Sequence, residues 1–321
     1  MNQSPAVLPE ASESAATRPV PVRLIASSGY PHDVAVAARG CAWLRHHGYH
    51  VNNPDILARR YLRFGGTDAE RLADLHAIGT GGAGELTLAV RGGYGQARLI
   101  GHVDFERIAA QARASGTPIV GHSDFTAFQL AYLAATGGVT FAGPMLLADF
   151  GEEHVNRFMW EHFEGILRNP ACQIAVEAPQ ADPAATVEGT LWGGNLAMIC
   201  SLLGTPYFPQ IDGGILFLED INEPPYRVER MLLQLLQAGV LARQQALVLG
   251  DFSNYRTTDY DNGYDMAAVF DYVRTQVRIP LLTGLPFGHC PRKLTLPVGA
   301  QARLASQADG FTLALSGYPT L

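Results

Sequence analysis

The 321-residue sequence has little cysteine, little charge and no long apolar run. Its four cysteines include no C-x-x-C pair, which predicts reduced thiols rather than a disulfide framework. No stretch of about 18 apolar residues occurs, so the sequence predicts no membrane-spanning helix. Lysine and arginine total 23 against 30 acidic residues, a net charge of −7, which argues against nucleic-acid binding because phosphate recognition needs a basic face.

Residues 1–18 have the composition of a disordered tail. They are rich in Ala, Ser, Pro and Glu, and they lack the basic start and apolar centre of a secretory signal. Together with the reduced cysteines, this composition predicts a cytoplasmic protein.

Two domains are expected after the tail. Over residues 19–150, short β-branched runs alternate with helical stretches, which predicts an α/β domain with a mostly parallel sheet flanked by helices. The pattern loosens over residues 151–185, where an amphipathic helix precedes a Pro/Ala/Asp-rich stretch, and we interpret this segment as a linker. Residues 186–321 are expected to form a smaller C-terminal α/β domain, whose last short strands are antiparallel.

The sharpest local feature is Gly121-His122-Ser123-Asp124, between an apolar strand and a helix. A serine at such a turn projects its hydroxyl from the carboxyl edge of the sheet, where α/β proteins bind ligands. The next amide, that of Asp124, lies at a helix start and can stabilise an oxyanion. Ser123 can equally be a helix cap, and Phe125 departs from the G-x-S-x-G pattern.

Glycines follow another expected strand, in Arg91-Gly92-Gly93-Tyr94-Gly95. Backbone amides in such a loop approach a ligand closely, so the segment is either an oxyanion donor or a tight turn. The spacing is not that of a dinucleotide-binding loop, and no H-E-x-x-H occurs around His154 and His162. The sequence therefore predicts neither a cofactor nor a metal.

A general base and a carboxylate are available elsewhere. His289 stands in a Gly/Pro-rich loop after a short strand and could act as the base, although His122 adjoins the serine. Glu219 ends an apolar strand and could orient an imidazole, with Asp220 and Glu223 as the neighbouring candidates.

Taken together and in order, these segments resemble one family, the LD-carboxypeptidases. The resemblance spans about residue 22 to the C-terminus, through Ala26-Ser27-Ser28-Gly29-Tyr30, Arg91–Gly95, Gly121–Thr126, Gly189-Thr190-Leu191-Trp192-Gly193-Gly194-Asn195-Leu196, Leu218–Glu223 and Phe287-Gly288-His289.

The resemblance implies that Ser123 is the nucleophile, Glu219 the acid and His289 the base, with an oxyanion hole formed by the amides of Gly93 and Asp124. It implies an N-terminal domain like that of class I glutamine amidotransferases, and a homodimer. The implied reaction is hydrolysis of the L,D-peptide bond before the terminal D-alanine of murein tetrapeptides, in cell-wall recycling.

Three other functions remain to be distinguished. They are a related peptidase that cleaves peptidyl-nucleotide antibiotics, a non-catalytic muropeptide-binding protein, and a cysteine-based amidotransferase, although no cysteine occupies the turn held by Ser123. The sequence does not select between Arg91 and Arg227 as the partner of the substrate carboxylate.

Overall fold

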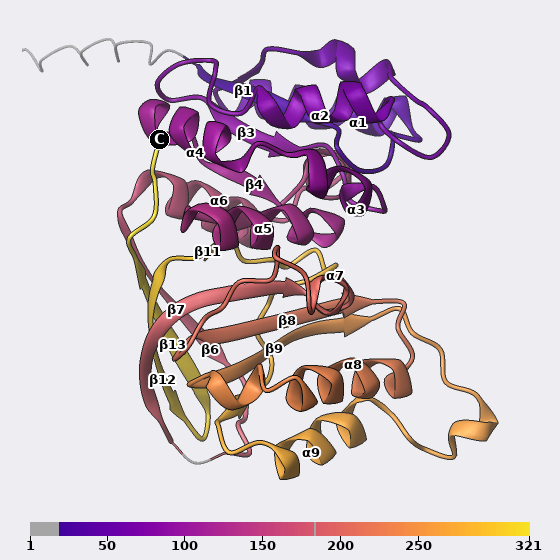
Figure 1. Cartoon of the computed structure of the whole chain (residues 1–321), viewed down its shortest axis with the longest axis vertical. Coiled ribbons are helices and arrows are strands. Elements are labelled where there is room, and N and C mark those ends of the chain that lie inside the picture. The colour runs from indigo at the N-terminus through magenta and orange to yellow at the C-terminus, as the bar shows by residue number, and fades with distance from the viewer. Residues whose placement is uncertain (1–18, 183) are drawn as a thin grey trace, which may run out of the picture.

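The computed structural model describes residues 19–182 and 184–321, so the expected tail, residues 1–18, lies outside the described part. The first sheet has six strands in the order β11-β5-β4-β3-β1-β2, all parallel except β11 (Figure 1). Their bounds are Val20–Ile25 (β1), Tyr49–Val51 (β2), Leu86–Ala89 (β3), Ile119–Gly121 (β4), Thr140–Ala142 (β5) and Leu296–Val298 (β11).

Helices flank this sheet, as the alternating pattern predicted. Thr67 and Glu70 form a capping box at the start of α2. The helices are Val34–His46 (α1), Asp68–His76 (α2), Gln96–Leu99 (α3), Phe105–Ser115 (α4), Thr126–Thr136 (α5) and Arg157–Arg168 (α6); the shorter turns are Pro54–Ala58 (η1), Ile100–His102 (η2), Ser123–Phe125 (η3) and the π-helical Leu146–Phe150 (η4).

The second sheet has seven strands in the order β10-β9-β8-β7-β12-β13-β6. Strands β7 to β10 are parallel, whereas β12, β13 and β6 extend the sheet in antiparallel fashion, as expected for the last strands of the chain. The bounds are Ala171–Glu177 (β6), Thr186–Asn195 (β7), Ile215–Ile221 (β8), Ala246–Ser253 (β9), Leu281–Leu282 (β10), Gln301–Gln307 (β12) and Gly310–Ser316 (β13); the helices are Leu196–Leu202 (α7), Pro225–Gln237 (α8), Met266–Gln276 (α9), Leu241–Arg243 (η5) and Asp259–Asp261 (η6).

The expected α/β class with two sheets is confirmed, but the interpretation of residues 151–185 as a linker needs correction. This segment carries α6 and then β6, which is paired with β13 along its whole length. In addition, β11 lies within the expected C-terminal domain, yet it pairs with β5 of the first sheet. Both pairings join strands that are distant in sequence, which a local pattern of residues does not reveal.

The carboxyl ends of the parallel strands of both sheets meet. β7 ends beside the start of α5, where the amide of Asn195 donates to Thr126 Oγ1 at 3.2 Å, and α5 contacts α7 between the two layers (Figure 1). This shared edge is the usual place for a ligand in an open α/β sheet. Among the described helices, none has both the length and the apolar character needed to cross a bilayer.

Candidate active site

The turn after β4 holds Ser123 in a rare backbone conformation. Ser123 has a φ of +64°, in the left-handed region that residues with a side chain adopt only at a cost of about 1–3 kcal/mol. Its hydroxyl does not cap the following helix but donates to His289 Nε2 at 3.0 Å. Such strain concentrates at functional sites because it aims one side chain at a fixed point.

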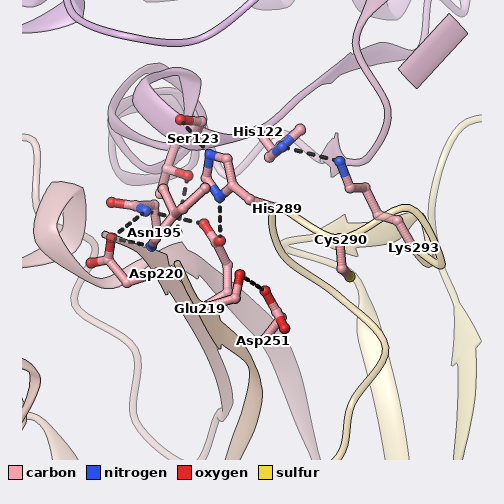
Figure 2. A network of polar contacts seen from close by, with 12 residues as sticks. His122, Ser123, Asn195, Glu219, Asp220, Asp251, His289, Cys290 and Lys293 are labelled. Carbon is pink, nitrogen blue, oxygen red and sulfur yellow. Dashed lines mark hydrogen bonds and ion pairs between the residues drawn. The ribbon is translucent and has the colours of Figure 1, made fainter. Parts of the chain in front are cut away.

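Ser123, His289 and Glu219 form a continuous chain of hydrogen bonds (Figure 2). His289 Nδ1 donates to Glu219 Oε2 at 2.8 Å, which leaves the Nε2 lone pair directed at the serine. The carboxylate is completely buried on β8, whereas the imidazole is 18% exposed and so remains accessible to a ligand. The hydroxyl–imidazole–carboxylate order is that of serine hydrolases.

Burial and the carboxylate act in opposite directions on the pKa of His289. Burial by itself lowers it, but the hydrogen bond to Glu219 and the charge of that carboxylate outweigh burial, so the pKa is raised above its ordinary value of 6.5. Lys293 is a smaller, lowering influence. The imidazole is therefore a stronger base than an isolated histidine, as proton abstraction from a hydroxyl requires.

The strand geometry separates Glu219 from Asp220. Asp220 accepts from the amide of Ala197 at 2.9 Å, at the start of α7, and it does not contact His289. The side-chain amide of Asn195 donates to both carboxylates, at 3.1 Å to Glu219 and 3.0 Å to Asp220 (Figure 2). Burial and then the charge of Glu219 raise the pKa of Asp220 to about 6.

The third acid, Glu223, pairs with Arg227 in the first turn of α8. Of the three carboxylates that the sequence offered, the structure therefore brings only Glu219 to the imidazole of His289.

His122 is directed away from Ser123 and is bonded through both ring nitrogens. Nδ1 donates to the carbonyl of Gly143 at 2.9 Å, and Nε2 accepts from Lys293 at 3.2 Å (Figure 2). Lys293 also donates to Asp149 at 2.8 Å. Complete burial and the Lys293 charge hold the pKa of His122 well below 6.5, so this ring is neutral and cannot serve as the base.

The glycine loop Gly92-Gly93 lies against the serine. A Cβ on Gly92 would be 2.7 Å from Ser123 Oγ and 3.5 Å from the amide nitrogen of Asp124, so no larger residue fits there. Gly93 has a φ of +108°, which also favours glycine. Gly93 lines the same cavity as Ser123, and the amide of Asp124 directly follows the serine in the chain. The Asp124 side chain is used elsewhere, accepting from Ser28 Oγ at 2.6 Å.

Two cavities meet at His289. One, of about 260 Å³, is lined by Arg91, Gly93 and Ser123; the other, of about 400 Å³, is lined by Asp149, His154 and Lys293. Both include Ala148 and Glu152 as well as His289. A larger hollow of about 570 Å³, over β6, β12 and β13, contains none of these residues. The two cavities that share His289 therefore provide room for a substrate next to the imidazole.

Among residues 19–182 and 184–321, no three His, Cys, Asp or Glu side chains gather as metal ligands would. His154 lines the larger of the two cavities at His289, whereas His162 packs on Phe158 with ring centroids 4.2 Å apart. The four cysteines are all free thiols, and Cys290 lines the same cavity as His154.

Prolonged chelation followed by desalting should leave turnover unchanged, because the hydrogen-bonded chain from Ser123 to Glu219 needs no Lewis acid to activate the hydroxyl. The measurement is the rate of product release before and after treatment. Loss of activity that zinc restores would contradict this prediction and would return attention to His154.

Sequence reasoning assigned no role to several polar residues of the site. Asn195 lies in the segment 189–196 that resembles the family, and its position at the end of a strand is the available signal. Asp149 and Lys293 gave no signal, because a lysine and an aspartate 144 positions apart reveal their pairing only in the folded chain.

Comparisons with known proteins agree with this arrangement. The LD-carboxypeptidase N-terminal domain model matches residues 22–143, and the LD-carboxypeptidase C-terminal domain model matches residues 188–304. A probable murein peptide carboxypeptidase of Bacillus subtilis is 32% identical over 80% of each chain. The crystal structure of a muramoyltetrapeptide carboxypeptidase from Oxalobacter formigenes is 42% identical, with a TM-score of 0.86, covering 94% of this chain and 100% of that one.

The microcin C7 self-immunity protein of Escherichia coli is a more distant relative. It is 25% identical to this chain and covers 87% of both sequences. The lower identity places the carboxypeptidases nearer to this chain than the immunity protein.

Proposed function

This chain belongs to the LD-carboxypeptidase family and is a serine-type enzyme, and on that premise we propose that Ser123 is its nucleophile, His289 its base and Glu219 its acid. The observation that carries the proposal is the unbroken pair of hydrogen bonds through His289, at 3.0 and 2.8 Å. It extends from a strained serine on one sheet to a buried carboxylate on the other.

The proposed reaction uses these groups in two steps. His289 Nε2 takes the proton of Ser123 while Oγ attacks the scissile carbonyl, and the resulting imidazolium is stabilised by Glu219. The carbon–nitrogen bond then breaks, and His289 returns the proton to the leaving amine. In the second step His289 deprotonates a water molecule, which hydrolyses the acyl-enzyme ester and restores the Ser123 hydroxyl.

The amides of Gly93 and Asp124 are proposed to bind the oxyanion of each tetrahedral intermediate. Support comes from the fit of Gly92 against Ser123, which brings the Gly93 loop and the Asp124 amide to the same hydroxyl. Donors that are already fixed by the fold lose little energy in reorganising as the negative charge develops.

The proposed substrate is a murein tetrapeptide, from which the enzyme releases the terminal D-alanine. The names of the similar proteins support this substrate, since one is named a probable murein peptide carboxypeptidase and another a muramoyltetrapeptide carboxypeptidase. The bond cleaved would join the L-centre of the third residue, diaminopimelate or lysine, to D-alanine.

Incubating the purified protein with L-Ala-D-Glu-meso-diaminopimelate-D-Ala tests the proposal. We expect equimolar tripeptide and free D-alanine, measured by chromatography, and no cleavage when the last residue is L-alanine. A protein that binds the tetrapeptide without releasing D-alanine would be the non-catalytic binder instead. Cleavage of a peptidyl-nucleotide in preference to the tetrapeptide would favour the alternative of a related peptidase that acts on peptidyl-nucleotide antibiotics.

The enzyme is further proposed to act in the cytoplasm as a homodimer. The four free thiols support a reducing compartment, and the dimer rests on the resemblance to the family. Light scattering should give about twice the 34.6 kDa mass of the chain. A monomer that is fully active would remove the dimer from the proposal.

The pH dependence of kcat/KM should have an acidic limb set by His289. The base acts only when neutral, and Glu219 raises its pKa, so kcat/KM should fall about tenfold per pH unit below a midpoint above 6.5. Steady-state kinetics from pH 5 to pH 9 would measure the midpoint.

Asp220, with its pKa near 6, titrates in the same range and must be separated from the base. The Asp220→Asn variant should keep the limb, shifted slightly to lower pH because a neighbouring negative charge is gone. Disappearance of the limb in that variant would assign it to Asp220.

A further inference from the structure

Arg91 places a positive charge in the cavity of Ser123 without an ion-pair partner: the one acid that lines this cavity, Glu152, is not within ion-pair distance of it. Its guanidinium lines that cavity, donates to the carbonyl of Tyr30 at 3.2 Å, and contacts His32 Nδ1 at 2.9 Å. Within residues 19–182 and 184–321, no carboxylate lies within 4.0 Å of it, in contrast to the arginines that form ion pairs. Burial, and then the charge of Arg63, lower the pKa of Arg91. A half-buried cation that has no ion-pair partner within the protein is stabilised when a ligand supplies an anion.

The other candidate cations are already neutralised. Lys293 is buried against Asp149 at 2.8 Å, and its remaining contact is His122. Arg227, the other candidate from the sequence, pairs with Glu223 and lines neither cavity at His289. Arg91 is therefore the cation that this part of the structure leaves available to a substrate.

The guanidinium and the nucleophile flank the same short loop. A Cβ on Gly93 would be 3.7 Å from Arg91 Nη2, while a Cβ on Gly92 would be 2.7 Å from Ser123 Oγ. In a C-terminal residue, only the amide nitrogen and Cα separate the scissile carbonyl from the carboxylate. A group that anchors this carboxylate must accordingly stand about one residue from the nucleophile, and Arg91 lines the same cavity as Ser123.

The position of Arg91 is held in advance by the loop after β1. The amide of Gly29 donates to the carbonyl of Gly92 at 3.2 Å, and a Cβ on Gly29 would be 3.3 Å from Arg91 Nε. Together with the Tyr30 carbonyl, this packing fixes the guanidinium plane before a ligand arrives. A fixed guanidinium loses little conformational entropy when it binds a carboxylate through two hydrogen bonds.

We propose that Arg91 binds the terminal carboxylate of the leaving amino acid and thereby restricts cleavage to the last peptide bond. The inference rests on the proposed function, since it assigns one end of that substrate. It predicts an enzyme that discriminates a free C-terminus from a blocked one, because the amide of a blocked substrate leaves the buried cation without a partner.

The test compares the tetrapeptide acid with its C-terminal amide in wild type, Arg91→Gln, Arg91→Lys and Arg63→Gln. Wild type should prefer the acid by on the order of a hundredfold in kcat/KM. Arg91→Gln should lower kcat/KM for the acid to the value for the amide and leave kcat/KM for the amide unchanged. Arg91→Lys should restore part of the preference for the acid. Arg63→Gln, which removes a nearby charge outside the cavity, should retain it.

An unchanged acid preference in Arg91→Gln, or an equal loss for both substrates, would overturn the inference, since the second result describes a residue that only supports the loop. Binding of both ligands to Ser123→Ala by calorimetry separates this outcome from failure of the proposed function. Binding that depends on Arg91, without turnover in wild type, would refute the function alone. Turnover without a preference for the acid would refute the inference alone. Absence of both turnover and Arg91-dependent binding would refute the proposed function and the inference together.

Discussion

Ser123→Ala is expected to lower kcat by at least about a thousandfold while the fold stays intact. Without Oγ no acyl-enzyme forms, and His289 Nε2 loses the hydroxyl that it contacts at 3.0 Å. Alanine keeps the Cβ that packs near Gly92, so the shape of the loop is retained. The remaining rate reflects binding and the oxyanion donors alone.

The measurement is D-alanine release by the variant, with circular dichroism and thermal unfolding as checks on folding. Ser115→Ala is a matched control, because among the described residues the hydroxyl it removes bonds only to α4 and to Thr117. It should keep wild-type turnover. A folded Ser123→Ala enzyme that retained a tenth of wild-type kcat would show that the nucleophile is another residue.

Glu219→Gln is expected to lower kcat by up to about ten-thousandfold. Both carboxylate oxygens accept hydrogen bonds, one from His289 and one from Asn195. Glutamine offers a single acceptor, so one donor loses its partner, or the amide donates to Nδ1 and moves the histidine proton to Nε2. In that tautomer the ring cannot take a proton from the serine, and the charge that stabilises the imidazolium is also gone.

Asp220→Asn makes the same chemical change one residue further along β8 and is the control. Asp220 contacts Asn195 and the start of α7 rather than the imidazole, so this variant should retain most of its activity. The kcat values of the two variants should be compared at equal folded fraction, checked by circular dichroism. If Asp220→Asn is inactive and Glu219→Gln is active, the acid is misassigned.

Those parts of the site that follow an apolar run could be predicted from sequence. Ser123 comes just after the buried strand β4, and Glu219 lies near the carboxyl end of the buried strand β8; the carboxyl ends of such strands meet at one edge. The φ of +64° at Ser123 could not be predicted, because no local pattern of residues requires it. In this conformation the serine packs against Gly92, a contact between separate loops.

Strands of unusual composition or with distant partners are hard to predict from a local pattern of residues. β7 contains Gly193 and Gly194, which have low strand propensity but are required at positive φ, and a Cβ on Gly194 would be 2.6 Å from Thr126. β6 pairs with β13, so Ala171 lies opposite Ser316, near the other end of the chain. The buried ion pair of Lys293 and Asp149 could not be predicted for the same reason, because its two residues meet only in the folded chain.

The return of β11 to the first sheet determines how far the chain can be shortened. β11 covers the edge of β5, with Pro297 opposite Phe141, and a proline in an outer strand discourages any further strand from joining. Residues 19–150 produced alone would lack this cover and would present the unprotected edge of β5 to other molecules. An exposed edge of this kind templates intermolecular pairing, so the fragment would aggregate rather than behave as an isolated domain.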